Sequence, residues 1–238
     1  MHNPAKELES KEMTFLDHFE ELRSRLLKSL IALAVTTALS FIFAQSLLEL
    51  IAFPIGGLGK LQAIEVTESI SVYMRVSLLS GVVFAMPVIV YQLLRFILPG
   101  LTSKEKRWIR LAVPSATILF ASGVYFAFEY MLPPAIEFLT TFLDVQTSPR
   151  LSNYISFVIN IMFWIGISFE APLLVFILAK LHLVTGKGLL KQWRIAIVVI
   201  AVIAAMITPT VDPVNMAILM LPLFMLYLIS VFLAFIAR

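Results

Sequence analysis

The chain has 238 residues, of which 60% are hydrophobic and only 14% are charged. A soluble domain is about 45–50% apolar and about 25% charged, and a chain of this size has too little interior to hide such an apolar excess. The absence of cysteine excludes disulfides, thiolate metal sites and cysteine nucleophiles. We therefore expect an all-α polytopic membrane protein, because lipid does not satisfy exposed backbone groups and no segment alternates as a barrel strand does.

The N-terminal segment, residues 1–25, is rich in charge and precedes the first apolar run. It is too charged, and is followed by too many further spans, to be a cleavable signal peptide. Within it, Thr14–Lys28 predicts an amphipathic helix, since apolar side chains recur every three or four residues. Glu21 and Arg25 stand four residues apart on the polar face, so one interpretation is a solvated, ion-paired surface.

Six apolar runs follow, and we assign them to one transmembrane domain, residues 26–238. A span needs about 20 apolar residues to cross about 30 Å of hydrocarbon. The predicted spans are Leu26–Leu48, Ile70–Leu94, Ile109–Leu132, Leu151–Ala179, Ile195–Thr208 and Pro213–Ile236. The fifth span, as a helix, would be only about 21 Å long. Either the bilayer thins beside it, or Lys191 and Arg194 lengthen it by snorkelling.

The distribution of basic residues predicts the orientation. All but three of the 18 Lys and Arg residues fall in the termini and in the connections after the second and fourth spans. Lys60, Arg75 and Arg150 fall on the other side. The positive-inside rule therefore places both termini in the cytoplasm, as six spans require.

The connection after the second span contains an acid with two possible roles. Leu98-Pro99-Gly100 ends the second helix, and Thr102 with Glu105 fits a capping box that starts the third. Glu105 therefore has a structural role available. It is also the only acid between Glu68 and Glu129, on the side that carries most of the positive charge.

Glu170 is an acid near the middle of the fourth span, about 15 Å of helix rise before Lys180. A charge at that depth costs about 2.5–3.5 kcal/mol on insertion scales. One interpretation is a functional acid that faces a cavity or a partner helix. The other is a protonated carboxyl hydrogen-bonded inside the bundle, for example to Ser168. Asp212 lies in the last outer turn, where it would cap the sixth span ahead of Pro213.

The remaining polar residues exclude several classes of chemistry. No histidine pair has metal-ligand spacing, and no glycine-rich phosphate loop is present. No span contains an Asp–Asp pair, a Ser–His pair or a histidine set for hydrolysis. We therefore expect no enzymatic activity, no metal, no cofactor and no nucleic-acid partner.

Several short motifs follow one another in a characteristic order. They are His18-Phe-Glu-Glu-Leu-Arg-Ser-Arg-Leu26, Phe53-Pro54, Pro87-Val-Ile-Val-Tyr-Gln92, Phe96-Ile-Leu-Pro99, Lys104-Glu-Lys-Arg107, Ser156-Phe157, Gly166-Ile-Ser-Phe-Glu-Ala-Pro172 and Thr208-Pro209 with Asp212. In order, side and spacing they resemble the TatC family, the multi-span subunit of the twin-arginine protein translocase. The resemblance runs from about residue 13 to the C-terminus.

The resemblance implies a concave bundle in a bacterial or archaeal-type cytoplasmic membrane. It implies a core receptor that binds twin-arginine signal peptides on the cytoplasmic face. The receptor would recruit single-span partners of the TatA and TatB type, as a homo-oligomer within a larger complex, to export folded proteins. The positions matching the family's signal-peptide site are Glu21, Glu105, Arg23, Phe96 and Arg107. The family's mid-membrane glutamate matches Glu170, and its outer-loop residues match Pro54 and Asp212, although Thr210-Val211 makes the last loop one residue longer than the common form.

The chemistry of the peptide agrees with these matches. Two adjacent guanidiniums need carboxylates that accept hydrogen bonds in a bidentate way. We expect Glu21 and Glu105 to supply them and to be free of internal pairs.

Two alternatives stay open at this stage. Pro114 and Pro222 occupy corresponding spans, a pattern typical of a proton-coupled secondary transporter with inverted three-helix repeats, in which Glu170 would be the proton site. A passive assembly scaffold is the other alternative. It predicts that charge-neutral changes at Glu21 and Glu105 have no effect.

Overall fold

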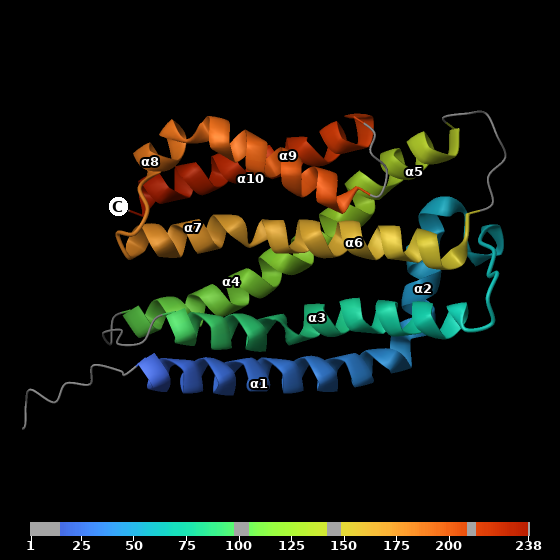
Figure 1. Cartoon of the computed structure of the whole chain (residues 1–238), viewed down its shortest axis with the longest axis horizontal. Helices are drawn as coiled ribbons and strands as arrows, with labels where there is room; N and C mark the ends of the chain where they lie inside the picture. The colour runs from blue at the N-terminus through green and yellow to red at the C-terminus, as the bar shows by residue number, and fades with distance from the viewer. Residues whose placement is uncertain (1–14, 98–104, 142–148, 209–212, 238) are drawn as a thin grey trace, which may run out of the picture.

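A computed structural model describes residues 15–97, 105–141, 149–208 and 213–237. Within these ranges the chain is almost entirely helical, and the one extended pairing is an isolated bridge between Gln62 and Arg150. Most of the helices run side by side along the long axis of the molecule (Figure 1). The all-α class predicted from composition is confirmed.

Six helical passes cross the described part of the molecule, in the predicted order. Five are long and apolar enough to cross a membrane, and α9 is a shorter apolar helix. The passes are α1 (Phe15–Ser40) with η2 (Phe41–Phe43) and α2 (Ala44–Ala52); α3 (Glu68–Ile97); α4 (Glu105–Phe126) with η5 (Ala127–Met131) and α5 (Leu132–Thr141); α6 (Leu151–Phe169) with α7 (Ala171–Lys180); α9 (Trp193–Ile207); and α10 (Pro213–Ile236).

Two boundaries differ from the prediction. The amphipathic segment and the first span form one continuous helix, α1. The third pass does not end at Leu132 but continues through Pro133 and Pro134 to Thr141. Prolines are tolerated in the first turn of a helix, where their missing N–H groups are not needed. The wider π-helical turn η5 lies immediately before them and accommodates this change of helix.

The first two passes approach each other closely at Gly81. The Thr36 hydroxyl donates a hydrogen bond of 2.8 Å to the Gly81 carbonyl oxygen. A Cβ atom added at Gly81 would lie 2.9 Å from the backbone nitrogen of Thr37. Small residues allow such backbone contact between membrane helices, so α1 packs directly on α3.

The hydrophobic core is centred on α6, which lies between α3 and α4 on one side and α9 and α10 on the other (Figure 1). Its inward face is closed to solvent and lipid, with Ile155, Val158, Ile161 and Ile165 all 1% exposed or less. At Gly166 this helix comes within van der Waals contact of α4. The fourth pass is therefore the axis on which the others pack.

That pass is broken at Glu170. The α-helical pattern stops at Phe169 and resumes at Ala171, with Pro172 in the first turn of α7. Proline lacks an N–H to donate to the carbonyl four residues earlier, and this accounts for the break. The break lies beside the one acid of this pass.

The connection after the first pass contains two short 3₁₀ helices, η3 (Phe53–Ile55) and η4 (Leu58–Lys60). Gly56 and Gly57 join them at φ angles of +91° and +96°, which residues with a side chain rarely adopt. The helix α8 (Gly186–Lys191) was not predicted; Thr185 caps it by accepting a hydrogen bond of 3.1 Å from the Gly188 N–H.

Candidate functional site

The first turns of α1 lie against the C-terminal end of α3. The imidazole of His18 stacks on the ring of Phe96, with centroids 4.5 Å apart and an interplanar angle of 20°. Two turns farther along α1, Arg25 Nη1 donates a hydrogen bond of 3.2 Å to Gln92 Oε1. Glu21 lies between these two contacts in the chain, so it is held at the same end of the bundle as the end of α3.

Glu21 forms an ion pair within its own helix. Arg25 donates to Glu21 Oε1 from Nη2 at 2.8 Å and from Nε at 3.3 Å. The Glu21 side chain keeps 20% of its surface exposed. The ion-paired interpretation is therefore confirmed, and the expectation that Glu21 is free of internal pairs is wrong, because Arg25 is one turn away on the same face. Both hydrogen bonds end at Oε1, so Oε2 takes no part in the pair.

Glu105 lies at the start of the described part of α4, and Thr102, the other member of the predicted capping box, lies outside the described residues. The start of α4 packs on the end of α3, where Leu94 and Ala112 belong to one buried cluster. Figure 1 shows the starts of α1 and α4 and the end of α3 at one end of the molecule. Arg23 is exposed on α1 at this end. Arg107 lies in the first turn of α4, and its side chain and that of Glu105 lie outside the described part of the structure.

Glu170 is buried at the break in the fourth pass, with 8% of its surface exposed. Its Oε1 has no hydrogen-bond partner among the described residues. The Ser168 hydroxyl donates instead to the Trp164 carbonyl oxygen at 2.8 Å. No hydrogen bond therefore joins Ser168 to Glu170, and one carboxyl oxygen of this acid is left without a partner inside the bundle, among the residues that the structure describes.

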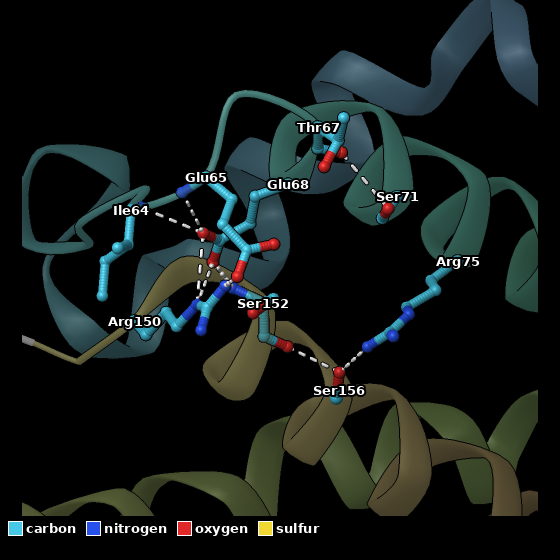
Figure 2. A network of polar contacts seen from close by, with 9 residues as sticks. All are labelled: Ile64, Glu65, Thr67, Glu68, Ser71, Arg75, Arg150, Ser152 and Ser156. Atoms are coloured by element: carbon cyan, nitrogen blue, oxygen red, sulfur yellow. Dashed lines mark hydrogen bonds and ion pairs between the residues drawn. The ribbon is translucent and has the colours of Figure 1, made fainter.

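A polar network that the sequence did not predict lies at the opposite end (Figure 2). The Glu68 carboxylate accepts hydrogen bonds from the N–H groups of Ser152 at 2.6 Å and Ile64 at 2.9 Å, and from Arg150 Nε at 3.2 Å. Arg150 Nη2 also pairs with Glu65 Oε1 at 2.7 Å. The carboxylates of Glu65 and Glu68 raise the pKa of Arg150, so it stays charged. Through these bonds, the network connects the segment between α2 and α3 to the start of α6.

One signal in the sequence pointed to this network. Arg150 is one of only three basic residues on the predicted outer side, and it directly precedes the fourth span. Its partner Glu68 is 82 positions away, so spacing along the chain did not reveal the pair.

The two outer-loop candidates lie away from Glu21. Pro54 is half-buried in η3, beyond the far end of the first pass. Asp212 lies outside the described residues. No cluster of three or more His, Asp or Glu side chains in the described part of the chain could hold a metal ion.

Comparisons with known proteins match almost the whole chain. The family model described as "Sec-independent protein translocase protein (TatC)" matches residues 17–222. The chain belongs to the TatC family. The Sec-independent protein translocase protein TatC of Carboxydothermus hydrogenoformans is 33% identical over 230 residues, which cover 95% of each chain. The TatC protein of Deinococcus radiodurans is 36% identical over 231 residues, which cover 93% of this chain and 86% of that one.

A solved structure matches the fold as well. A crystal structure of the twin-arginine translocase receptor TatC superposes with a TM-score of 0.80 at 35% identity. The match covers 92% of this chain and 99% of that one. The six-pass arrangement is therefore that of the TatC fold.

Membership of the TatC family decides between the function classes. TatC is a component of a protein translocase and not an enzyme, so the predicted lack of enzymatic activity is confirmed. The secondary-transporter alternative is not favoured, because the relatives and the solved structure named above are protein translocase components. This TatC-family chain is a core subunit of the twin-arginine translocation system.

Proposed function

We propose that this chain binds twin-arginine signal peptides where α1, α3 and α4 meet, with Glu21 and Glu105 as the carboxylates that accept the two guanidiniums. The single observation that supports this proposal best is the stacking of His18 on Phe96. It brings the first turns of α1 to the end of α3, and α4 begins with Glu105 only a short connection later. Two acids from distant parts of the sequence thus share one end of the bundle.

The ion pair of Glu21 fits a receptor that exchanges partners. An ion pair between neighbouring turns of one helix contributes only about 0.3–0.5 kcal/mol. A peptide arginine can bind Oε2 or replace Arg25 at Oε1, and the protein then loses little of the free energy of this internal pair. We assign Arg23, Phe96 and Arg107 to the same site, with Phe96 as an apolar contact for the peptide beside its arginines.

This end of the bundle is proposed to face the cytoplasm. All but three of the 18 basic residues fall in the segments that the positive-inside rule assigns to that side. Figure 1 shows that the end of α7, the helix α8 and the end of α10 lie at the same end of the molecule as the start of α1. Orientation and peptide site are thus consistent, since a precursor awaiting export is presented from the cytoplasm.

We further propose that the chain assembles in a bacterial-type cytoplasmic membrane with single-span partners of the TatA and TatB type, and with copies of itself. The buried carboxyl of Glu170 supports a partner contact, because its Oε1 has no partner among the described residues and a polar group from another helix would satisfy it. Pro54 and Asp212 are proposed to shape the outer loops of this assembly.

The test is binding of a fluorescent twin-arginine peptide to purified protein in detergent. Glu21→Ala and Glu105→Ala should each weaken binding about tenfold or more, because each removes a charge-assisted acceptor. Glu20→Ala, which removes an exposed acid next to Glu21, is the matched control and should bind as the unaltered protein does.

Two outcomes would count against this site. Crosslinking of the peptide that persists in both Glu21→Ala and Glu105→Ala would refute the assignment. Unchanged binding in the charge-neutral variants Glu21→Gln and Glu105→Gln would favour a passive scaffold.

A further inference from the structure

Arg75 is a cation on the apolar helix α3 without a carboxylate partner. It is seven residues from the start of this helix, about 10 Å along its axis from the outer end. It is exposed, and its neighbours Met74 and Leu78 are 53% and 49% exposed and face the lipid. Among the described residues, none of the ion pairs includes Arg75. The guanidinium is therefore close to the membrane interface with most of its donors unused.

The one hydrogen bond of Arg75 connects it to the fourth pass. Its Nη1 donates to the Ser156 hydroxyl oxygen of α6, and Figure 2 shows the side chain extending from α3 toward Ser156. Arg150, which lies nearby in the same view, is already paired with Glu65 and Glu68. Arg75, unlike Arg150, thus has charge to offer to a ligand, and its contact with Ser156 sets it apart from the exposed Lys60.

Ser156 also lines a cavity of about 690 Å³ between η3, α5 and α6. Asn153, Ser156 and Asn160 are three and four residues apart, so they share one face of α6. The two asparagines are exposed, and neither carboxamide forms a hydrogen bond to any residue the structure describes. Exposed carboxamides without an internal partner are available to hydrogen-bond a ligand or water in the cavity. The volume is in the range of small-molecule sites.

We propose that Arg75 and this cavity bind the head group of a phospholipid from the outer leaflet. The phosphate accepts hydrogen bonds from the guanidinium of Arg75, which matches phosphate geometry. The carboxamides of Asn153 and Asn160 bond the neutral polar part of the head group, for which the uncharged cavity lining is suited. An acyl chain lies along the exposed apolar residues beside Arg75. The site is separate from the proposed peptide site and does not depend on it.

The lipid is identified by its phosphate, so the probe is a short-chain phosphatidylglycerol. Purified protein in a non-ionic detergent is titrated with this lipid, and the bound lipid is counted by native mass spectrometry. Arg75→Gln should weaken binding about fivefold, the effect of one basic residue at an anionic surface. Arg75→Lys should retain most of the affinity. Lys60→Gln, which removes another exposed outer cation, is the matched control and should bind as the unaltered protein does.

A second variant examines the cavity independently of charge. Asn160→Leu should also weaken lipid binding, and circular dichroism of each variant establishes that it is folded. Equal lipid retention in Arg75→Gln and in the unaltered protein would overturn the proposal. So would full displacement of the lipid by millimolar inorganic phosphate, which would assign the site to a free anion instead.

Discussion

At the scale of single residues, the surroundings of two acids at opposite ends of the bundle give them different roles. Glu68 has 1% of its side chain exposed and accepts hydrogen bonds from backbone N–H groups and from Arg150. Glu21 keeps 20% of its side chain exposed, and the arginine that pairs with it uses one of its two oxygens. A fully satisfied, buried carboxylate holds structure, whereas a partly exposed one with an oxygen outside its ion pair can accept a ligand.

The ion pair of Glu21 leads to a prediction about Arg25. Arg25→Gln removes the internal competitor for the carboxylate, so we expect it to strengthen binding of a twin-arginine peptide about two- to fivefold. Lys28→Gln removes an exposed cation one turn along and serves as the control for net charge. Peptide titration by fluorescence anisotropy measures both variants. Weaker binding in Arg25→Gln would show that Arg25 does not compete with the peptide.

The outer network leads to a prediction about stability. Glu68→Gln should lower the free energy of unfolding by about 1.5–3 kcal/mol, because it removes the charge from a buried acceptor of several hydrogen bonds. Glu65→Gln acts on the same Arg150, but the Glu65 side chain is 63% exposed. We expect Glu65→Gln to lower the free energy of unfolding by less than about 1 kcal/mol. Denaturant unfolding of both variants in detergent provides the comparison, and equal losses would contradict the distinction.

At the scale of helices, hydropathy and charge predicted the number, order and approximate extent of the passes. The short fifth pass was predicted too, and α9 with its 15 residues rises about 22 Å. The continuation of the third pass to Thr141 was not predicted, because Pro133-Pro134 is typical of a loop. Its helical continuation depends on the π-helical turn before it, which no local pattern indicates. Hydropathy reports burial in lipid, but it does not report how one helix joins the next.

Contact between α1 and α3 at Gly81 allows a test at this scale. In Gly81→Ala the added Cβ would lie 2.8 Å from the Cα of Thr37, so α1 must move away from α3. We expect a loss of about 1–3 kcal/mol in unfolding free energy, the usual cost of overpacking. Peptide binding should fall as well, since Glu21 and Phe96 depend on this packing. Gly59→Ala is the control, because its Cβ would meet nothing within 4 Å. Similar stability of the two variants would argue against close packing of α1 on α3.

At the scale of the whole molecule, the passes bring residues from distant parts of the chain to two polar ends. The pairing of Glu21 with Arg25 was predicted from their spacing, and so was the presence of a helix that includes Glu105. Three other contacts could not be predicted from spacing, because their partners are 67 to 82 residues apart. They are Arg25 with Gln92, Glu68 with Arg150, and Arg75 with Ser156. Local spacing predicts which residues share a helix face, and only the fold determines which helices meet.

The proposed role of the carboxylates is examined most directly by comparing a labelled Arg-Arg signal peptide with the same peptide carrying Lys-Lys. An ammonium cannot bind a carboxylate in the bidentate way that a guanidinium does. We expect the Arg-Arg peptide to bind about tenfold or more tightly, and the preference to disappear in a Glu21→Gln, Glu105→Gln double variant. Equal binding of the two peptides, or a preference that survives in the double variant, would contradict the assignment of these two acids.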